Sequence, residues 1–133
     1  MVEFPVPVTA LYAGLNALIM LGLACAIPPQ RIKKRIGLGH GGDARLEQAI
    51  RAHANNTEHV PMALLLIGLL ELMAAPLWLL HALGAALTLA RLAHAQGLYQ
   101  TPLASPGRFV GTVFTWTVMG IGALTCLYYS TAV

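Results

Sequence analysis

The sequence predicts an all-α integral membrane protein, a four-helix up-down bundle that forms one domain over residues 1–133. Hydrophobic residues make up 57% of the chain and charged residues only 10%. The mean hydropathy of +0.69 lies far outside the range of ordinary soluble domains. Uncharged or nearly uncharged runs also recur at about the length of 20 residues that a helix needs to cross a bilayer.

The first two helices are expected over residues 6–27 and 44–73. The run from Val6 to Ile27 carries no charge, and Pro28–Pro29 is expected to end the helix. The second apolar run, from Val60 to Met73, is short, so its helix must begin in the polar stretch before it and project from the membrane. Asp43 can cap this helix by accepting from the free N–H groups of its first turn.

The last two helices are expected over residues 76–97 and 108–129. The third helix is uncharged as far as Ala90 and can continue to Gln96, and the fourth occupies the uncharged run after Arg108. Short turns on one side and a longer glycine-rich loop on the other favour an up-down bundle.

The basic residues predict the orientation. All eight fall in the loop between the first two helices or at the near ends of the later three, and the positive-inside rule makes that side cytoplasmic. Both termini then lie on the non-cytoplasmic side. The net charge of +3 favours anionic lipid headgroups and anionic substrates. A nucleic-acid partner is not expected, because basic residues do not alternate with exposed aromatic residues.

The candidate chemistry begins on the second helix. Glu47, Arg51, Asn55 and Glu58 follow one another at steps of four, four and three residues, which places them on one helical face. Asn55 and Glu58 lie within about a turn of the apolar run, where an unpaired carboxylate is costly and usually marks a function.

Other polar residues are expected at the same membrane level, from the third and fourth helices: Arg91, His94, Gln96 and Arg108. Guanidinium groups bind carboxylates through two parallel hydrogen bonds, and a carboxylate can hold an ammonium group. The cluster therefore suits a small zwitterionic ligand, and a peptide-like thiol would match it.

These residues form the patterns Glu47-x-x-x-Arg51-x-x-x-Asn55-x-x-Glu58-x-x-Pro61 and Arg91-x-x-His94-x-Gln96-Gly97. With them, most of the chain resembles the membrane-associated proteins in eicosanoid and glutathione metabolism (MAPEG), above all their small bacterial members. The resemblance implies a homotrimer in the bacterial inner membrane, with glutathione as co-substrate between neighbouring subunits near the cytoplasmic face. It also implies transferase or peroxidase activity on a lipophilic small molecule.

The resemblance also assigns roles. Arg108 is expected to stabilise the glutathione thiolate as the catalytic residue. The residues expected to bind glutathione are Arg51, Asn55, Glu58, His59, Arg91 and His94. Structural or orienting roles are expected for Glu47, Pro61, Gln96 and Tyr99. Leu98 stands where a tyrosine of the family is expected.

Other readings stay open beside the enzyme. The chain could be a non-catalytic membrane protein, or a small multidrug-type transporter, which would need a proton-carrying acid within the membrane. Glu71 is the candidate acid, and its place near the far end of the second helix suggests an interfacial residue instead. No metal or haem is expected, because His53, His59, His81 and His94 show no paired-ligand spacing.

Overall fold

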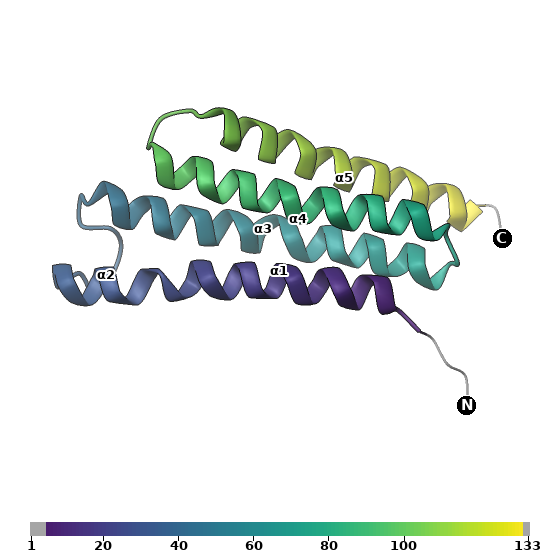
Figure 1. Cartoon of the computed structure of the whole chain (residues 1–133), viewed down its shortest axis with the longest axis horizontal. Coiled ribbons are helices and arrows are strands. Elements are labelled where there is room, and N and C mark those ends of the chain that lie inside the picture. The colour runs from purple at the N-terminus through teal and green to yellow at the C-terminus, as the bar shows by residue number, and fades with distance from the viewer. Residues whose placement is uncertain (1–4, 132–133) are drawn as a thin grey trace.

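The computed structural model describes residues 5–131, which contain helices and connecting segments but no strand, so the all-α prediction is confirmed for this range. The helices are α1 (Pro7–Cys25), α2 (Ile27–Lys34), α3 (Ala44–Leu72), α4 (Leu77–Gln100) and α5 (Pro106–Thr131). Figure 1 shows α1, α3, α4 and α5 side by side, with α2 continuing the line of α1. The α2–α3 and α4–α5 connections lie at one end of the bundle, and α1 begins and α5 ends at the other. The chain termini themselves lie outside the described residues.

The first helix does not end at Pro28–Pro29, which corrects that expectation. Ala26 keeps a right-handed helical conformation between α1 and α2, and the prolines occupy the first turn of α2. Proline is tolerated there because its missing N–H would have no partner inside the helix. The helical segment therefore extends from Pro7 to Lys34. Several basic residues that were expected in a loop consequently lie on a helix.

Asp43 caps α3, as predicted. Its carboxylate accepts a hydrogen bond from the backbone N–H of Leu46 at 2.8 Å and also pairs with the Lys34 ammonium. The Lys34 hydrogen bond, followed by that of Leu46, holds the pKa of Asp43 below its usual value. The Asp43 contribution to stability is therefore complete above the ordinary carboxyl pKa and is lost as pH falls through the lowered one. The contact ties the end of α2 to the start of α3.

Three helical segments among the described residues are long and apolar enough to cross a membrane: Pro7–Lys34, Leu77–Gln100 and Pro106–Thr131. α3 does not meet that criterion, because its first half carries the charged residues near Glu47 and only its second half is apolar. It nevertheless packs along its length against α1, α4 and α5. The chain is an integral membrane protein, and its fold packs a helix with one polar half against apolar helices.

Glu71 has a structural role at the far end of the bundle. Its carboxylate accepts hydrogen bonds from the backbone N–H groups of Val8 at 2.8 Å and Thr9 at 2.7 Å. These groups belong to the first turn of α1, which has no side-chain cap of its own. A carboxylate at a helix N-terminus satisfies free donors and complements the helix dipole. The acid that a transporter would need is thus engaged in holding α1 against α3.

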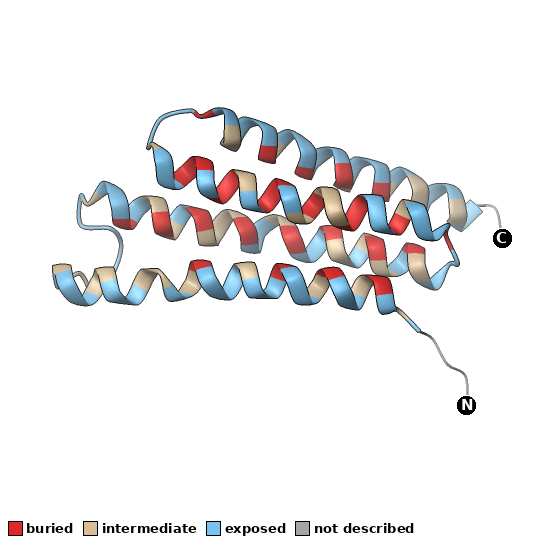
Figure 2. Ribbon diagram, viewed as in Figure 1, coloured by how far each residue is buried: buried red, intermediate tan, exposed pale blue. Residues whose placement is uncertain are grey.

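The core lies where the helices face one another, and the outward faces are apolar as well. Figure 2 shows buried positions along the inner faces and exposed positions along the outer ones. Ile67, Leu80 and Leu87 are almost fully buried in the main apolar cluster. Large apolar side chains point outward, and Trp78 and Leu124, for example, are 71% and 70% exposed. Such a surface fits contact with lipid chains and would be unfavourable in water.

Candidate functional site

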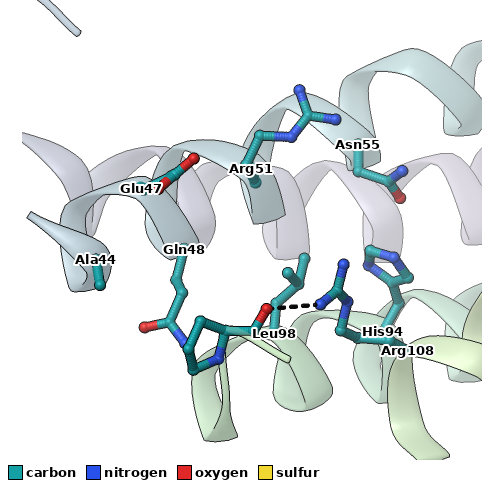
Figure 3. Close-up of a pocket in the computed structure, with 9 residues that line it drawn as sticks. Ala44, Glu47, Gln48, Arg51, Asn55, His94, Leu98 and Arg108 are labelled. Carbon is teal, nitrogen blue, oxygen red and sulfur yellow. Dashed lines mark hydrogen bonds between the residues drawn. The ribbon is translucent and has the colours of Figure 1, made fainter. Parts of the chain in front are cut away.

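A polar cavity of about 290 Å³ lies near the end of the bundle that carries the α2–α3 and α4–α5 connections, between α3, α4 and α5. Its volume is close to the lower limit of about 300 Å³ for small-molecule sites. The lining residues are Ala44, Glu47, Gln48, Arg51, Asn55, His94, Leu98, Pro102 and Arg108. Figure 3 shows Arg51 and Asn55 on one side of the cavity and His94 and Arg108 on the other.

α3 supplies one wall. Glu47, Arg51 and Asn55 are each four residues apart, so their side chains share the face that borders the cavity. Glu58 continues the sequence pattern, but it is exposed and does not line this cavity. Within a single chain, the carboxylate beside Arg51 and Asn55 is therefore that of Glu47.

Arg91 lies behind the cavity wall and is only 1% exposed. Its Nη2 donates a hydrogen bond to Asn55 Oδ1 at 2.7 Å, and its Nη1 donates to Thr115 Oγ1 at 3.2 Å. No carboxylate pairs with Arg91 among residues 5–131. Because Arg91 occupies the amide oxygen of Asn55, the amide nitrogen is the group left to meet a ligand. Asn55 therefore presents a hydrogen-bond donor to the cavity.

α4 and α5 supply the opposite wall. His94 is 5% exposed, and its Nδ1 has no hydrogen-bond partner in the described part of the chain. Arg108 donates from Nη1 to the carbonyl oxygens of Pro102, at 3.2 Å, and Leu103, at 2.8 Å. These bonds hold the guanidinium at the cavity edge (Figure 3) and leave its Nη2 and Nε for a ligand.

The close approach of α4 and α5 brings Arg108 beside His94. A Cβ atom on Gly97 would lie 2.5 Å from the backbone nitrogen of Arg108 and 2.6 Å from Ser105 Oγ. Any larger residue at position 97 would therefore push the start of α5 away. Ser105 Oγ also donates to the carbonyl oxygen of Gly97 at 3.0 Å, which holds the α4–α5 connection against α4.

A second cavity, of about 440 Å³, adjoins the first and shares Asn55, His94 and Arg108 with it. Its remaining lining includes Phe109 and Trp116, which are 71% and 61% exposed on the outer face of α5. The polar cavity thus continues into a space bordered by large apolar side chains that face the lipid. A polar ligand in the first cavity and an apolar one in the second would meet at Arg108.

The other residues singled out in the sequence lie outside the first cavity. His59 Nδ1 donates to the carbonyl oxygen of Asn55 at 2.9 Å, one turn earlier in α3. Pro61 and Gln96 are exposed. Tyr99 is 43% exposed and borders a different cavity, beside α2.

The structure also adds residues that the sequence patterns did not single out. Gln48 and Ala44 line the cavity from α3, and they are four residues apart, so a helical projection of α3 could have found them. Pro102 contributes through a connector between two helices, where no periodic pattern operates. Among residues 5–131, no three His, Cys, Asp or Glu side chains gather in a way that could hold a metal ion.

Comparison with known proteins gives one family and one kind of relative. The model of the MAPEG family matches residues 9–128. The chain is 33% identical over 119 residues to "Inner membrane protein YecN" of Escherichia coli K12, covering 90% of this chain and 82% of the relative. The protein of the same name from Escherichia coli O6:H1 matches with the same values. No solved structure matches the chain.

Proposed function

The chain belongs to the MAPEG family, and from that premise we propose that it binds glutathione and joins the glutathione sulfur to lipophilic electrophiles. We further propose that it resides in a bacterial inner membrane, because the relatives are named inner membrane proteins. The basic end of the bundle then faces the cytoplasm, where glutathione is available. α3 is the fourth crossing in this proposal, packed against α4 and α5.

The observation that carries the proposal is the convergence of two guanidinium groups, an oriented amide and a carboxylate on one polar cavity. Glutathione has two carboxylates, one ammonium group and two amides. Arg51 and Arg108 suit the carboxylates and the sulfur end, and Glu47 suits the ammonium group. Asn55, held by Arg91, donates to a carbonyl or carboxylate oxygen. The unpartnered Nδ1 of His94 is a further polar contact that a ligand could satisfy.

Arg108 is proposed to favour the thiolate. A free thiol has a pKa of about 8.5, so most of it is protonated at neutral pH, and an adjacent guanidinium stabilises the anion. The thiol proton leaves to water. The sulfur then forms a bond to the electrophilic carbon, and the leaving group departs with its bonding electrons. With a hydroperoxide, two glutathione molecules would instead become a disulfide while the hydroperoxide is reduced to an alcohol and water.

The homotrimer remains part of the proposal. Support comes from the outward face of α3, where Glu58 is exposed and is followed by exposed Met62, Leu65 and Leu72. A carboxylate beside exposed apolar residues is costly in lipid and acceptable against a polar ligand or a neighbouring subunit. If glutathione lies between subunits, Glu58 can reach it from this face.

The direct test is an activity assay on the full chain, purified in non-ionic detergent and reconstituted in bilayers. We expect glutathione conjugation of an apolar aryl halide, or reduction of a lipid hydroperoxide, at a rate above that of glutathione alone. The control is the same preparation after heat unfolding. Glutathione binding without any turnover would support the non-catalytic alternative, and absence of binding would overturn the proposal.

A second prediction concerns Arg91 as a positioning residue. Arg91→Lys keeps the charge but cannot hold Asn55 and Thr115 together in one planar fork, so glutathione should bind about fivefold to tenfold more weakly. Asn55→Ala should weaken glutathione binding by a similar factor. If Arg91 acts through Asn55, the double variant binds no more weakly than Asn55→Ala alone. Calorimetric titration of the four proteins measures this, and fully additive losses would show that Arg91 acts independently.

A further inference from the structure

A third cavity, of about 480 Å³, lies on the other side of α3, between α2 and the end of α4. Three basic side chains line it from two helices: Lys33, Lys34 and Arg45. Tyr99 closes it from α4. It shares only Gln48 with the polar cavity between α3, α4 and α5, so the two sites are neighbours but distinct.

The charge of this cavity is strongly one-sided. None of its lining residues is acidic. One of its three cations, Lys34, pairs with the carboxylate of Asp43. Lys33 and Arg45 are exposed and pair with no carboxylate in the part of the chain that the structure describes. Two cations therefore remain uncompensated around one concave space, which favours an anion of the size of a phosphate group.

The position of the cavity relates it to the membrane surface. Tyr99 is the penultimate residue of α4, whose 24 residues span about 36 Å at 1.5 Å per residue. The hydrocarbon core is about 30 Å thick, so this end of α4 reaches the headgroup region. Ile32 and Leu38, on and just after α2, are 78% and 92% exposed. Exposed aliphatic residues beside a basic cluster fit the boundary between acyl chains and headgroups.

We propose that this cavity binds the headgroup of an anionic phospholipid, with Lys33 and Arg45 on the phosphate and the Tyr99 hydroxyl as a further donor. Basic pockets at the cytoplasmic ends of membrane helices bind acidic headgroups in this way. Because α2 carries Lys33 and Lys34, a bound lipid also joins α2 to α3 and α4. The site depends on α2 being a helix, since a flexible loop would not hold its basic residues against α3.

The test uses the full chain in non-ionic detergent, where no charged bilayer surface attracts the protein. Added phosphatidylglycerol should raise the midpoint of thermal unfolding and remain bound in native mass spectrometry, whereas phosphatidylcholine should do neither. Lys33→Gln and Arg45→Gln should each weaken phosphatidylglycerol binding about fivefold, the factor expected for one cation near an anionic headgroup. Arg35→Gln removes one charge from the same end of the bundle without lining the cavity and should change binding less than twofold.

Three results would overturn the proposal. The first is an equal loss of phosphatidylglycerol binding in the Arg35→Gln control and in the two cavity variants. The second is an equal rise of the unfolding midpoint with phosphatidylcholine. The third is the same rise with inorganic phosphate alone, which would indicate a soluble anion. Lys33 is exposed, so Lys33→Gln should fold and keeps the proposal testable even if Arg45→Gln does not fold. Glutathione affinity should be unchanged in Lys33→Gln, which separates this site from the proposed enzymatic one.

Discussion

Millimolar glutathione is expected to raise the midpoint of thermal unfolding of the purified chain, and Arg51→Ala is expected to abolish that rise. A ligand that binds only the folded state stabilises it by about 2.7 kcal/mol at 100 times its dissociation constant. Arg51 is exposed in the structure and lines the polar cavity, so its removal should affect the ligand far more than the fold. A thermal-shift series with and without glutathione measures both effects.

Arg45→Ala provides the matched control for Arg51→Ala. Arg45 is exposed on the same helix, fewer than two turns earlier, and does not line the polar cavity. We expect this variant to keep the full glutathione-dependent shift. A shift that survives in Arg51→Ala, or that disappears equally in both variants, would mean that the cavity on α3 does not bind the peptide.

Arg108→Ala is expected to lower the turnover number by one to two orders of magnitude while the affinity for glutathione changes by less than threefold. A hundredfold loss corresponds to about 2.7 kcal/mol of transition-state stabilisation, a reasonable share for one guanidinium facing a thiolate. The separation of the two effects follows from Arg51, Asn55 and Glu47 holding the rest of the peptide. Steady-state kinetics of the variant, beside direct binding, measures it.

The pH profile distinguishes thiolate stabilisation from a structural role of Arg108. Without the guanidinium, the bound thiol should ionise near its ordinary pKa of about 8.5, so the rate of Arg108→Ala should keep rising with pH through that value. The unaltered protein should level off at a lower pH. Arg108 also donates to the carbonyl oxygens of Pro102 and Leu103, so Arg108→Lys, which keeps a donor there, serves as control. Equal losses of affinity and turnover, with no recovery at high pH, would reduce Arg108 to a binding or structural residue.

Part of the candidate site could be predicted from helical periodicity. The four-residue spacing placed Arg51 and Asn55 on one face, and the structure brings that face to the same cavity as His94 and Arg108. The same spacing placed Glu58 with them, and the family resemblance added Tyr99, but both lie outside this cavity in the single chain. Periodicity fixes which residues share a face, whereas the rotation and spacing of neighbouring helices fix which part of that face is enclosed.

Composition and local chemistry by themselves determined the helical fold class and the start of α3. Long apolar runs specify helices in lipid because no other partner exists for the backbone, and Asp43 caps its helix through groups only three residues away. The family resemblance rested on the same linear patterns, and the family model confirms it.

Only the tertiary structure decided how distant residues pair. It placed Arg91 behind Asn55, directed the Glu71 carboxylate to the first turn of α1, and carried the first helix past Pro28–Pro29. The first two outcomes depend on groups 36 and 63 residues apart, and the third depends on the helical conformation that Ala26 keeps between α1 and α2. Buried polar groups take whichever partner the packed helices bring within about 3 Å, and that choice is made only when the helices come together.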